Sequence, residues 1–378
     1  MFWGTWAVAL ANVQATFGLS DGQLGILLAV SIALAGITGA VISHHAERFG
    51  SGRMLAGALG VWAVLLVGAG LAPTLAFFVV AFGLTEVAGG CVDTAMNAAS
   101  GARLMGRPGA LVRFHAFFTT GALLGAAVAG IVLHAGISWR WLWPTLALVA
   151  AALAVWTRRT VGEATLPALP TGLAPGASGD GGDTRGPLRR LRRDGLLLLL
   201  FIFALAEVTE GGVDTWGVLY LRTHLAAGVL LGAGAYVVGQ SVAALTRGAG
   251  GPVLGRLSPR IALVVGGSIA SAGILVESVS PDAVVAAVGL ALGAAGASLF
   301  WPLVMSDVSR VASRPTSAVG TFTGAGYCGL VAGAPLVGWV SDTYGLNRGL
   351  QVLAGAAALV ALTSLFSPAP SPHTKRGG

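Results

Sequence analysis

Residues 195–221 read GLLLLLFIFALAEVTEGGVDTWGVLYL, an apolar run that carries three carboxylates. A membrane-spanning helix needs about 20 apolar residues to cross the ~30 Å hydrocarbon core, so this run is long enough. Glu207, Glu210 and Asp214 interrupt it at spacings of three and four residues, which a helix gathers on one stripe. A stripe of acids in an apolar helix predicts a membrane protein with a polar interior.

The whole chain has the composition of a membrane protein. Its 378 residues are 55% hydrophobic and only 10% charged, with a mean hydropathy of +0.82. Soluble domains carry nearer a quarter of charged residues. Eleven further apolar runs cover residues 2–17, 23–44, 54–71, 75–99, 113–134, 140–156, 228–246, 260–279, 283–305, 317–340 and 349–366. The sequence therefore predicts an all-α membrane protein with 12 transmembrane helices.

One long polar segment divides these runs into six and six. Residues 157–194 contain four prolines and a Gly/Asp stretch, a composition that cannot bury a core and predicts a flexible linker. The expected domains are a six-helix bundle over 1–156, the linker over 157–194, a second bundle over 195–366 and a tail over 367–378. The first run is short, about 24 Å as a helix, and we expect it to be truncated.

Basic residues predict the orientation of the chain in the membrane. Of its 22 lysines and arginines, Arg140, Arg222 and Arg348 fall in one set of loops, and the other 19, Arg247 among them, fall in the opposite set and the tail. The positive-inside rule places both termini and the linker in the cytoplasm. The charges trace a membrane face, which excludes nucleic acid as a partner. The Arg189–Arg193 cluster indicates a topogenic flank or a contact with anionic lipid.

The two halves repeat one another. Gly121, Gly125 and Gly130 recur with the same spacing as Gly329, Gly333 and Gly338, 208 residues later. At this same offset Arg48 corresponds to Arg256. Two matches at one offset, in runs that a two-fold repeat equates, indicate an internal duplication.

A motif after the second run resembles a known family. Ser43–Arg53 reads SHHAERFGSGR and is similar to the G-x-L-x-D-R-x-G-R-R signature of the major facilitator superfamily, with Ser43 for glycine and Glu47 for aspartate. The resemblance implies two pseudo-symmetric six-helix bundles around a midplane site. It also implies a cytoplasmic latch formed by Glu47, Arg48, Arg53 and Arg256.

The fourth run resembles one branch of that family. Gly89–Asn97 reads GGCVDTAMN and looks like the G-x-x-E-T-A-x-N-P pattern of fucose/proton symporters, with Asp93 for glutamate. Arg113-Phe114-His115 and Asp214-x-Trp216 are similar to uncharacterised bacterial relatives of this branch. That symporter carries a carboxylate on its first helix, whereas here nothing acidic precedes Asp21.

Five carboxylates inside the runs are candidates for function, and each would cost roughly 2.5–3.5 kcal/mol if it faced lipid in ionised form. Glu86 and Asp93 lie with Asn97 within about 40° of one helical stripe, as Glu207, Glu210 and Asp214 share another. We expect both stripes to face one aqueous cavity. Proton coupling requires a carboxyl group that gains and loses a proton there, and we expect Asp93 first, then Glu207 or Glu210. The alternative is that some of these acids only bond to neighbouring helices.

Other candidates have two interpretations each. His115 and Arg113 at the start of the fifth run, and Trp216 and Trp301, could contact substrate or serve core and interface contacts. Trp139, Trp141 and Trp143 are typical of an aromatic belt at the membrane interface. Cys91 and Cys328 indicate buried small side chains, and no spacing predicts a metal site.

These observations favour a secondary active transporter of a small polar solute, sugar-like in character, by proton-coupled symport. The first alternative is a proton-coupled efflux antiporter for drugs or metabolites. Antiporters of this kind usually carry a Gly-Pro motif in the fifth helix, and residues 121–130 contain no proline. The second alternative is a membrane sensor or scaffold that does not transport.

The remaining expectations concern chemistry and location. The chain has no nucleophile–base constellation and no phosphate-binding loop, so we expect neither an enzyme nor an ATP-driven pump. The expected partners are a small-molecule substrate and membrane lipid, with no cofactor apart from a coupling proton, and we expect a monomer. Arginine outnumbers lysine, which occurs once as Lys375, a usage typical of GC-rich bacterial genes, so the expected location is a bacterial cytoplasmic membrane.

Overall fold

The computed structural model describes residues 1–49, 51–104, 108–161, 187–254 and 258–366, which form helices and no strands. The first group comprises α1 (Phe2–Phe17), α2 (Asp21–Phe49), α3 (Ser51–Gly70), α4 (Leu75–Leu104), α5 (Pro108–His134), the 3-10 turn η1 (Trp139–Trp141) and α6 (Leu142–Val161). The second comprises α7 (Pro187–Arg193), α8 (Leu197–Thr223), α9 (Val229–Leu254), α10 (Pro259–Val279), α11 (Ala283–Ala297), α12 (Phe300–Val311), α13 (Pro315–Tyr344) and α14 (Leu346–Ser364).

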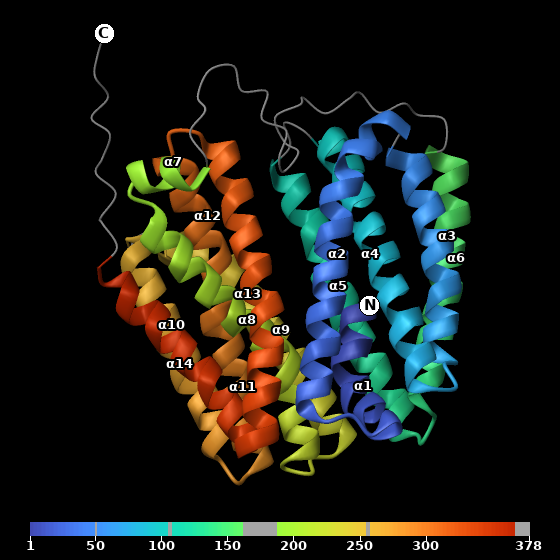
Figure 1. Cartoon of the computed structure of the whole chain (residues 1–378). Helices are drawn as coiled ribbons and strands as arrows, with labels where there is room; N and C mark the ends of the chain where they lie inside the picture. Colours follow the sequence, from blue (N-terminus) through green and yellow to red (C-terminus); the bar gives the residue numbers. More distant parts are fainter. Residues whose placement is uncertain (50, 105–107, 162–186, 255–257, 367–378) are drawn as a thin grey trace.

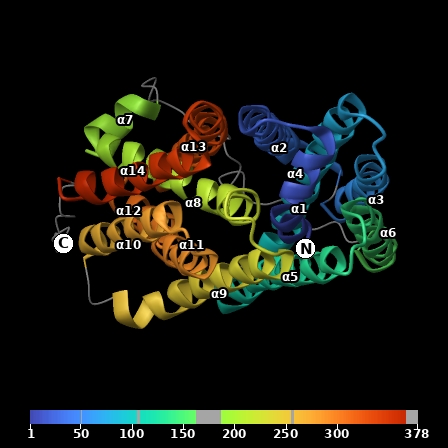
Figure 2. The same cartoon turned by 90° about the horizontal axis from the view of Figure 1, so that it is seen from below.

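The helices stand side by side in two groups, α1–α6 and α7–α14 (Figure 1). Seen along the helices, α3 and α6 form the outer edge of the first group, and α10 and α14 that of the second (Figure 2). The groups meet where α2 contacts α13, where α5 contacts α9 and where α1 contacts α8. The helices α1, α4 and α8 therefore lie towards the middle of the molecule.

Within the described residues, ten segments are long and apolar enough to cross a membrane. Their outward surfaces are apolar: Val64, Leu148 and Leu245 are each at least 70% exposed, which suits a lipid environment. All twelve predicted runs are helical. Two fall outside the ten, since α1 has only 16 residues and α8 carries several charges. The chain is thus a multi-pass, all-α membrane protein.

Several boundaries differ from the prediction. The helix α2 continues to Phe49, so Glu47 and Arg48 lie in a helix and not in the predicted loop. The segment predicted as a linker contains the short helix α7. Its residues 162–186, and the tail from 367, lie outside the described residues. A helix satisfies its own backbone hydrogen bonds, so it can extend beyond the apolar run that the hydrocarbon core requires.

The repeated glycines make the same contacts in both halves. In α5, Gly121 and Gly125 lie against Met1 before α1, and Gly130 lies against Ala233 of α9 in the other group. In α13, Gly329 and Gly333 lie against α8, and Gly338 lies against Asp21 of α2 in the other group. Each triplet therefore packs two glycines within its group and one across, as expected of a duplication.

The predicted aromatic belt is wrong for two of its three tryptophans. Trp139 and Trp143 are buried, and only Trp141 is exposed. Trp143 stacks on Phe78, with ring centroids 6.0 Å apart, and on Phe82 at the same distance. These rings form part of the core of the first group, because stacked aromatic rings bury a large apolar area together.

Candidate functional site

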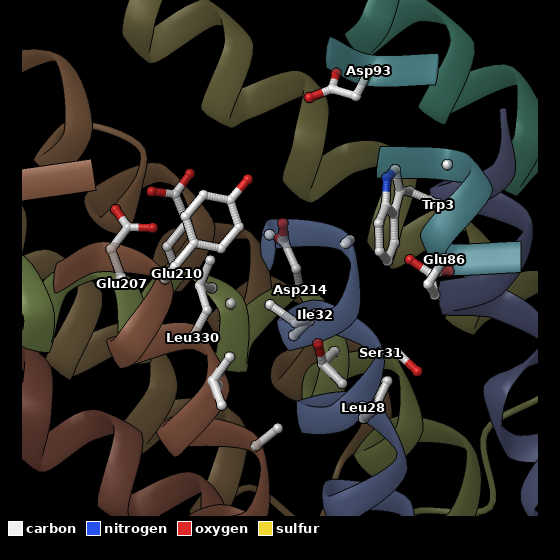
Figure 3. Close-up of a pocket in the computed structure, with 18 of the residues that line it drawn as sticks. Trp3, Leu28, Ser31, Ile32, Glu86, Asp93, Glu207, Glu210, Asp214 and Leu330 are labelled. Carbon is white, nitrogen blue, oxygen red and sulfur yellow. The ribbon is translucent and has the colours of Figure 1, made fainter. Parts of the chain in front are cut away.

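A cavity of about 1580 Å³ lies between the two groups of helices. Six polar residues predicted to face a shared cavity all line it: Glu86, Asp93, Asn97, Glu207, Glu210 and Asp214. Figure 3 shows Glu86 and Asp93 on one side and the three acids of α8 on the other. The structure therefore brings both predicted stripes to one space. The roles of these residues in proton coupling stay a prediction.

On the α4 side, the two acids lie in different surroundings. Asp93 is exposed to the cavity and accepts a hydrogen bond from Asn97 Nδ2, 3.1 Å from its Oδ1. Four residues separate them, the spacing at which side chains of one helix meet. Glu86, two turns away, is only 3% exposed, and its Oε1 has no hydrogen-bond partner among the described residues. A buried carboxyl without a partner is most stable in its neutral form.

On the α8 side, the three acids differ in their partners. Glu210 forms an ion pair with Arg247 of α9. Asp214 accepts a hydrogen bond of 2.7 Å from Gln240 Nε2, also on α9. Glu207 is 5% exposed, and its Oε1 has no partner among the described residues. The three acids differ in how easily each can lose a proton, although they share one stripe.

A break in the tenth predicted run explains the position of Arg247. The run splits into α11 and α12 around Ser298, four residues before Pro302. Proline has no N–H, so the Ser298 carbonyl loses the helical donor it would otherwise have. Arg247 Nε donates a hydrogen bond of 3.0 Å to that carbonyl oxygen while its Nη2 contacts Glu210. The guanidinium is therefore fixed between α8 and α11.

Hydrogen bonds join the two groups at one end of the cavity, which we call the closed end. Arg222 of α8 donates through Nη1 to the Val8 carbonyl oxygen at 2.8 Å and to Asn12 Oδ1 at 2.6 Å. Ser20 Oγ donates to Asp342 Oδ2 at 2.8 Å. From there the cavity lining extends along the helices to Asn97 and Gly320, towards the α2–α3 and α4–α5 turns.

The other predicted substrate contacts have different outcomes. Trp216 belongs to the cavity lining, but it is fully buried. Trp301 does not line the cavity: it is 40% exposed on α12 and contacts Phe203, with ring centroids 5.1 Å apart. Arg113 and His115 lie in α5, and their side chains are outside the described residues.

The latch residues also lie at the edge of what the structure describes. Arg53 is exposed on α3, and the backbones of Glu47 and Arg48 belong to α2. The side chains of Glu47 and Arg48, and the whole of Arg256, lie outside the described residues. Their latch role stays a prediction.

Sequence reasoning missed the contribution of α9. It placed Arg247 with the basic residues of the cytoplasmic loops, but Arg247 lines the cavity together with Gln240 and Tyr236. A signal was present, since positions 236, 240 and 247 are four and seven residues apart and share a helical stripe. The hydropathy of the run hid this stripe because most of its other residues are small and apolar.

Comparisons with known proteins agree with this architecture. The chain is 26% identical to the membrane protein MosC of Rhizobium meliloti over 96% of its length and 85% of that protein. It is 25% identical to an uncharacterised MFS-type transporter of Yersinia pestis, over 95% of this chain and 89% of the other.

Solved structures show the same fold. A variant of the nucleoside transporter NupG matches with a TM-score of 0.77 and 15% identity, covering 97% of this chain and 96% of the other. The Escherichia coli fucose:proton symporter matches with a TM-score of 0.58 and 19% identity, covering 97% of both chains. The family prediction is confirmed, as is the expectation of a transporter in place of an enzyme. Residues 1–334 match the family description Major Facilitator Superfamily, and the chain belongs to this family of transporters.

Proposed function

We propose that this protein carries a small polar solute across the cytoplasmic membrane of a bacterium by proton-coupled symport. The observation that carries the proposal is the single cavity into which both groups of helices place carboxyl groups. Placing a carboxyl group at membrane depth costs free energy, so such groups usually have a function. Proton transfer is the function best suited to them. The similarity in fold to a fucose:proton symporter and a nucleoside transporter is consistent with a polar solute.

The proposed topology has twelve spans. The helices α1 and α8 join the ten apolar segments, because both lie between the others and α8 is shielded from lipid by its neighbours. The excess of arginine places both termini in the cytoplasm. The basic α2–α3 and α4–α5 turns then face the cytoplasm, and the closed end faces outward. This arrangement is the inward-open state of an alternating-access transporter.

The proposed solute site lies between α4, α8 and α9. Asn97, Gln240 and Arg247 offer hydrogen-bond donors, and Asp93 offers an acceptor that is exposed to the cavity. Hydroxyl groups of a sugar-like solute can bond to donors and acceptors at once. The exposed ring of Trp3, beside Glu86 in Figure 3, offers a flat surface for a sugar ring. The proposed contacts therefore suit a polyhydroxylated molecule.

Proton coupling follows from competition within the same site. Protonation of Glu210 would remove its negative charge and release Arg247 for the solute. Asp93 is the acid most open to water, so it can exchange a proton with the cytoplasm in this state. We propose that Asp93 exchanges the proton and that Glu207 and Glu210 pass its effect to Arg247.

A binding screen followed by transport tests this proposal. Purified protein is first screened for thermal stabilisation by sugars, nucleosides, amino acids and drugs. The solute that binds is then offered to proteoliposomes with an imposed pH gradient. Wild-type protein should accumulate it when the side facing the closed end is acidic, and Asp93→Asn should only equilibrate it.

Asp282→Asn is the matched control. Asp282 caps α11 on the surface by accepting from Val284 N and Val285 N at 2.9 Å, and asparagine is an equally good cap. This variant should accumulate solute like the wild type. Unchanged gradient-driven accumulation by Asp93→Asn would remove Asp93 from coupling.

One observation favours the efflux alternative. The cavity is large and includes the exposed aromatic side chains Trp3 and Phe118, a lining that an apolar drug could occupy. The same proteoliposomes distinguish the two modes, because an antiporter accumulates solute on the more acidic side. Protein that binds a solute yet moves none under either gradient would instead support a sensor.

A further inference from the structure

A sixth membrane-embedded carboxyl group lies outside the cavity. Glu277 sits on α10, two residues before its end at Val279, and is 0% exposed. Both of its carboxylate oxygens are buried without a hydrogen-bond partner among the described residues. It does not belong to the cavity lining. Sequence reasoning did not count it among the acids of the runs, and the proposed coupling does not use it.

Glu277 is enclosed between α8, α10 and α11. Its Oε1 is 3.0 Å from the point where a side chain on Gly217 of α8 would begin, and Gly289 of α11 lies directly against its backbone. A side chain on Gly217 would also meet Leu290 Cδ1 of α11, so α8 packs closely on both α10 and α11 at this residue. On the next residue, the Ser278 carbonyl accepts a hydrogen bond of 3.1 Å from the Tyr220 hydroxyl of α8. The environment of Glu277 therefore depends on how closely α8 lies against α10 and α11.

Among the residues that the structure describes, no counter-charge faces the carboxyl group. Tyr220 is the titratable group of α8 beside it, and α11 contains no ionisable residue. Arg348 at the start of α14 is exposed and donates to Gln351. An ionised carboxylate with neither partner nor water is strongly disfavoured, so this arrangement requires the protonated form. Loss of the proton would favour any movement that lets water reach Glu277.

That movement has a definite location. Gly217 follows Asp214 by three residues on the acidic stripe of α8, towards the closed end. Five residues further, Arg222 on the same helix bonds to α1 and closes the cavity. Displacement of this end of α8 from α10 and α11 would move Arg222 as well. The carboxyl group of Glu277 and the closure of the cavity thus share one short segment of helix.

We propose that Glu277 is a proton-binding site outside the solute cavity, and that its protonation holds α8 in the position that closes this end of the transporter. The site rests on the proposed alternating access and is independent of which solute is carried. Acid on the outer side would favour closure, and alkali would favour opening. In a symporter this direction of the pH response would support transport, because proton binding from outside then promotes the inward-open state.

Distance measurements across the closed end test the proposal. Spin labels are placed through Thr74→Cys in the first group and Tyr344→Cys in the second, after Cys91→Ala and Cys328→Ala. Both positions are exposed: Thr74 lies just before α4, and Tyr344 ends α13 two residues after Asp342 of the closed end. Between about pH 5 and pH 9, a range that covers shifted carboxyl groups, the parent should gain a long-distance population as the pH rises. Glu277→Gln should lose that population and stay closed throughout.

Two further variants make the outcome decisive. Gly217→Ala places a methyl group against the carboxyl group, so it should open the closed end at lower pH than in the parent. Asp282→Asn, an exposed acid five residues from Glu277, should respond to pH as the parent does. A pH response in Glu277→Gln equal to that of the parent would overturn the proposal, and so would a parent whose distances do not depend on pH.

The result is separable from the proposed symport. If distances respond to pH through Glu277 but proteoliposomes show no proton-driven uptake, the site stands and the symport proposal fails. If uptake is proton-driven and Glu277→Gln leaves the distances pH-dependent, the site fails alone.

Discussion

At the residue scale, Arg247 connects more of the candidate site than any acid does. It contacts Glu210 and the Ser298 carbonyl at once, which uses the spread of donors on a guanidinium. A lysine ammonium has the charge but not the geometry. The carboxyl groups around Arg247 would repel one another without it, so the residue stabilises the site in addition to its proposed role in solute binding.

Arg247→Lys should therefore lower solute affinity by about tenfold or more. Losing one partner of a buried hydrogen-bonded charge pair costs roughly 2 kcal/mol or more, and the lower value applies here because Arg247 is partly exposed. The measurement is the concentration of solute that gives half-maximal thermal stabilisation. Arg348→Lys is the control, because Arg348 bonds only to Gln351 on its own helix in the described structure. Equal affinities for both variants would contradict the role of Arg247.

The identities of the acids could be predicted from the sequence, but their partners could not. Asp93 and Glu207 stood out because each interrupts an apolar run at a helical spacing. Arg247 did not stand out, since it lies where the run meets a basic turn and resembles a topogenic charge. Its place depends on a carbonyl freed on α11, a tertiary feature that no local pattern in α9 reveals. Trp301 lies on the same predicted run but packs on Phe203 outside the cavity, which is likewise a tertiary feature.

At the scale of the element, the split between α11 and α12 is functional if its free carbonyl holds Arg247. Pro302→Ala would restore an N–H donor to the Ser298 carbonyl and favour a continuous helix. We expect stability to rise, because proline inside a helix costs about 3 kcal/mol in an unconstrained context. We expect transport to fall, because Arg247 loses an acceptor. The measurements are the melting temperature and the initial rate of uptake in the same preparation.

Pro335→Ala is the control for this prediction. Pro335 also lies inside a helix, α13, but Arg247 does not bond to its surroundings. A loss of transport in Pro302→Ala with unchanged solute binding would show that the break serves some other purpose.

Glycines give a second prediction at this scale. A side chain on Gly338 would lie within 3.0 Å of the Asp21 backbone across the two groups, whereas Gly355 on α14 has open space around it. Gly338→Ala should destabilise the inward-open state and increase exposure of the closed end. Gly355→Ala should raise stability by about 0.5–1 kcal/mol, the usual gain when alanine replaces glycine in a helix. Thermal unfolding and hydrogen exchange of residues 18–24 measure the two effects.

At the scale of the whole molecule, Arg222 joins the two groups of helices at the closed end of the cavity. Hydrogen bonds to a charged group contribute about 1.5–3 kcal/mol each, so Arg222→Ala should shift the equilibrium towards opening by tenfold or more. Cys328 is a natural reporter, because it is exposed and lines the cavity, so the prediction that it is buried is wrong. With Cys91→Ala present, an impermeant maleimide added at the closed-end side should label Cys328 faster in this variant. Arg348→Ala, another arginine on that side, should not change the rate.

The overall plan was predictable because it depends on features repeated along the chain. Apolar runs locate the helices, and glycine triplets 208 residues apart identify the duplication. Ten runs meet the criteria of length and hydropathy for a span. The runs of α1 and α8 do not, and α8 fails because it carries the acids of the candidate site. The run that is excluded for its charges is therefore the one that carries most acids of the site, since a helix shielded by its neighbours tolerates charge that lipid would not.

The glycine triplets have a mechanical consequence. Gly130 lies against the Ala233 methyl group and Gly338 lies against the Asp21 backbone, so only small groups separate the helices at both places. Helices that meet through such small groups can change their angle without rotamer changes in interlocking side chains. The two halves touch at these two glycine contacts, which the internal symmetry relates. The halves can therefore rotate relative to one another while both contacts are kept. In the proposed alternating access, the change between states would then meet little steric resistance at the glycine contacts. The hydrogen bonds at the closed end would set its energy barrier.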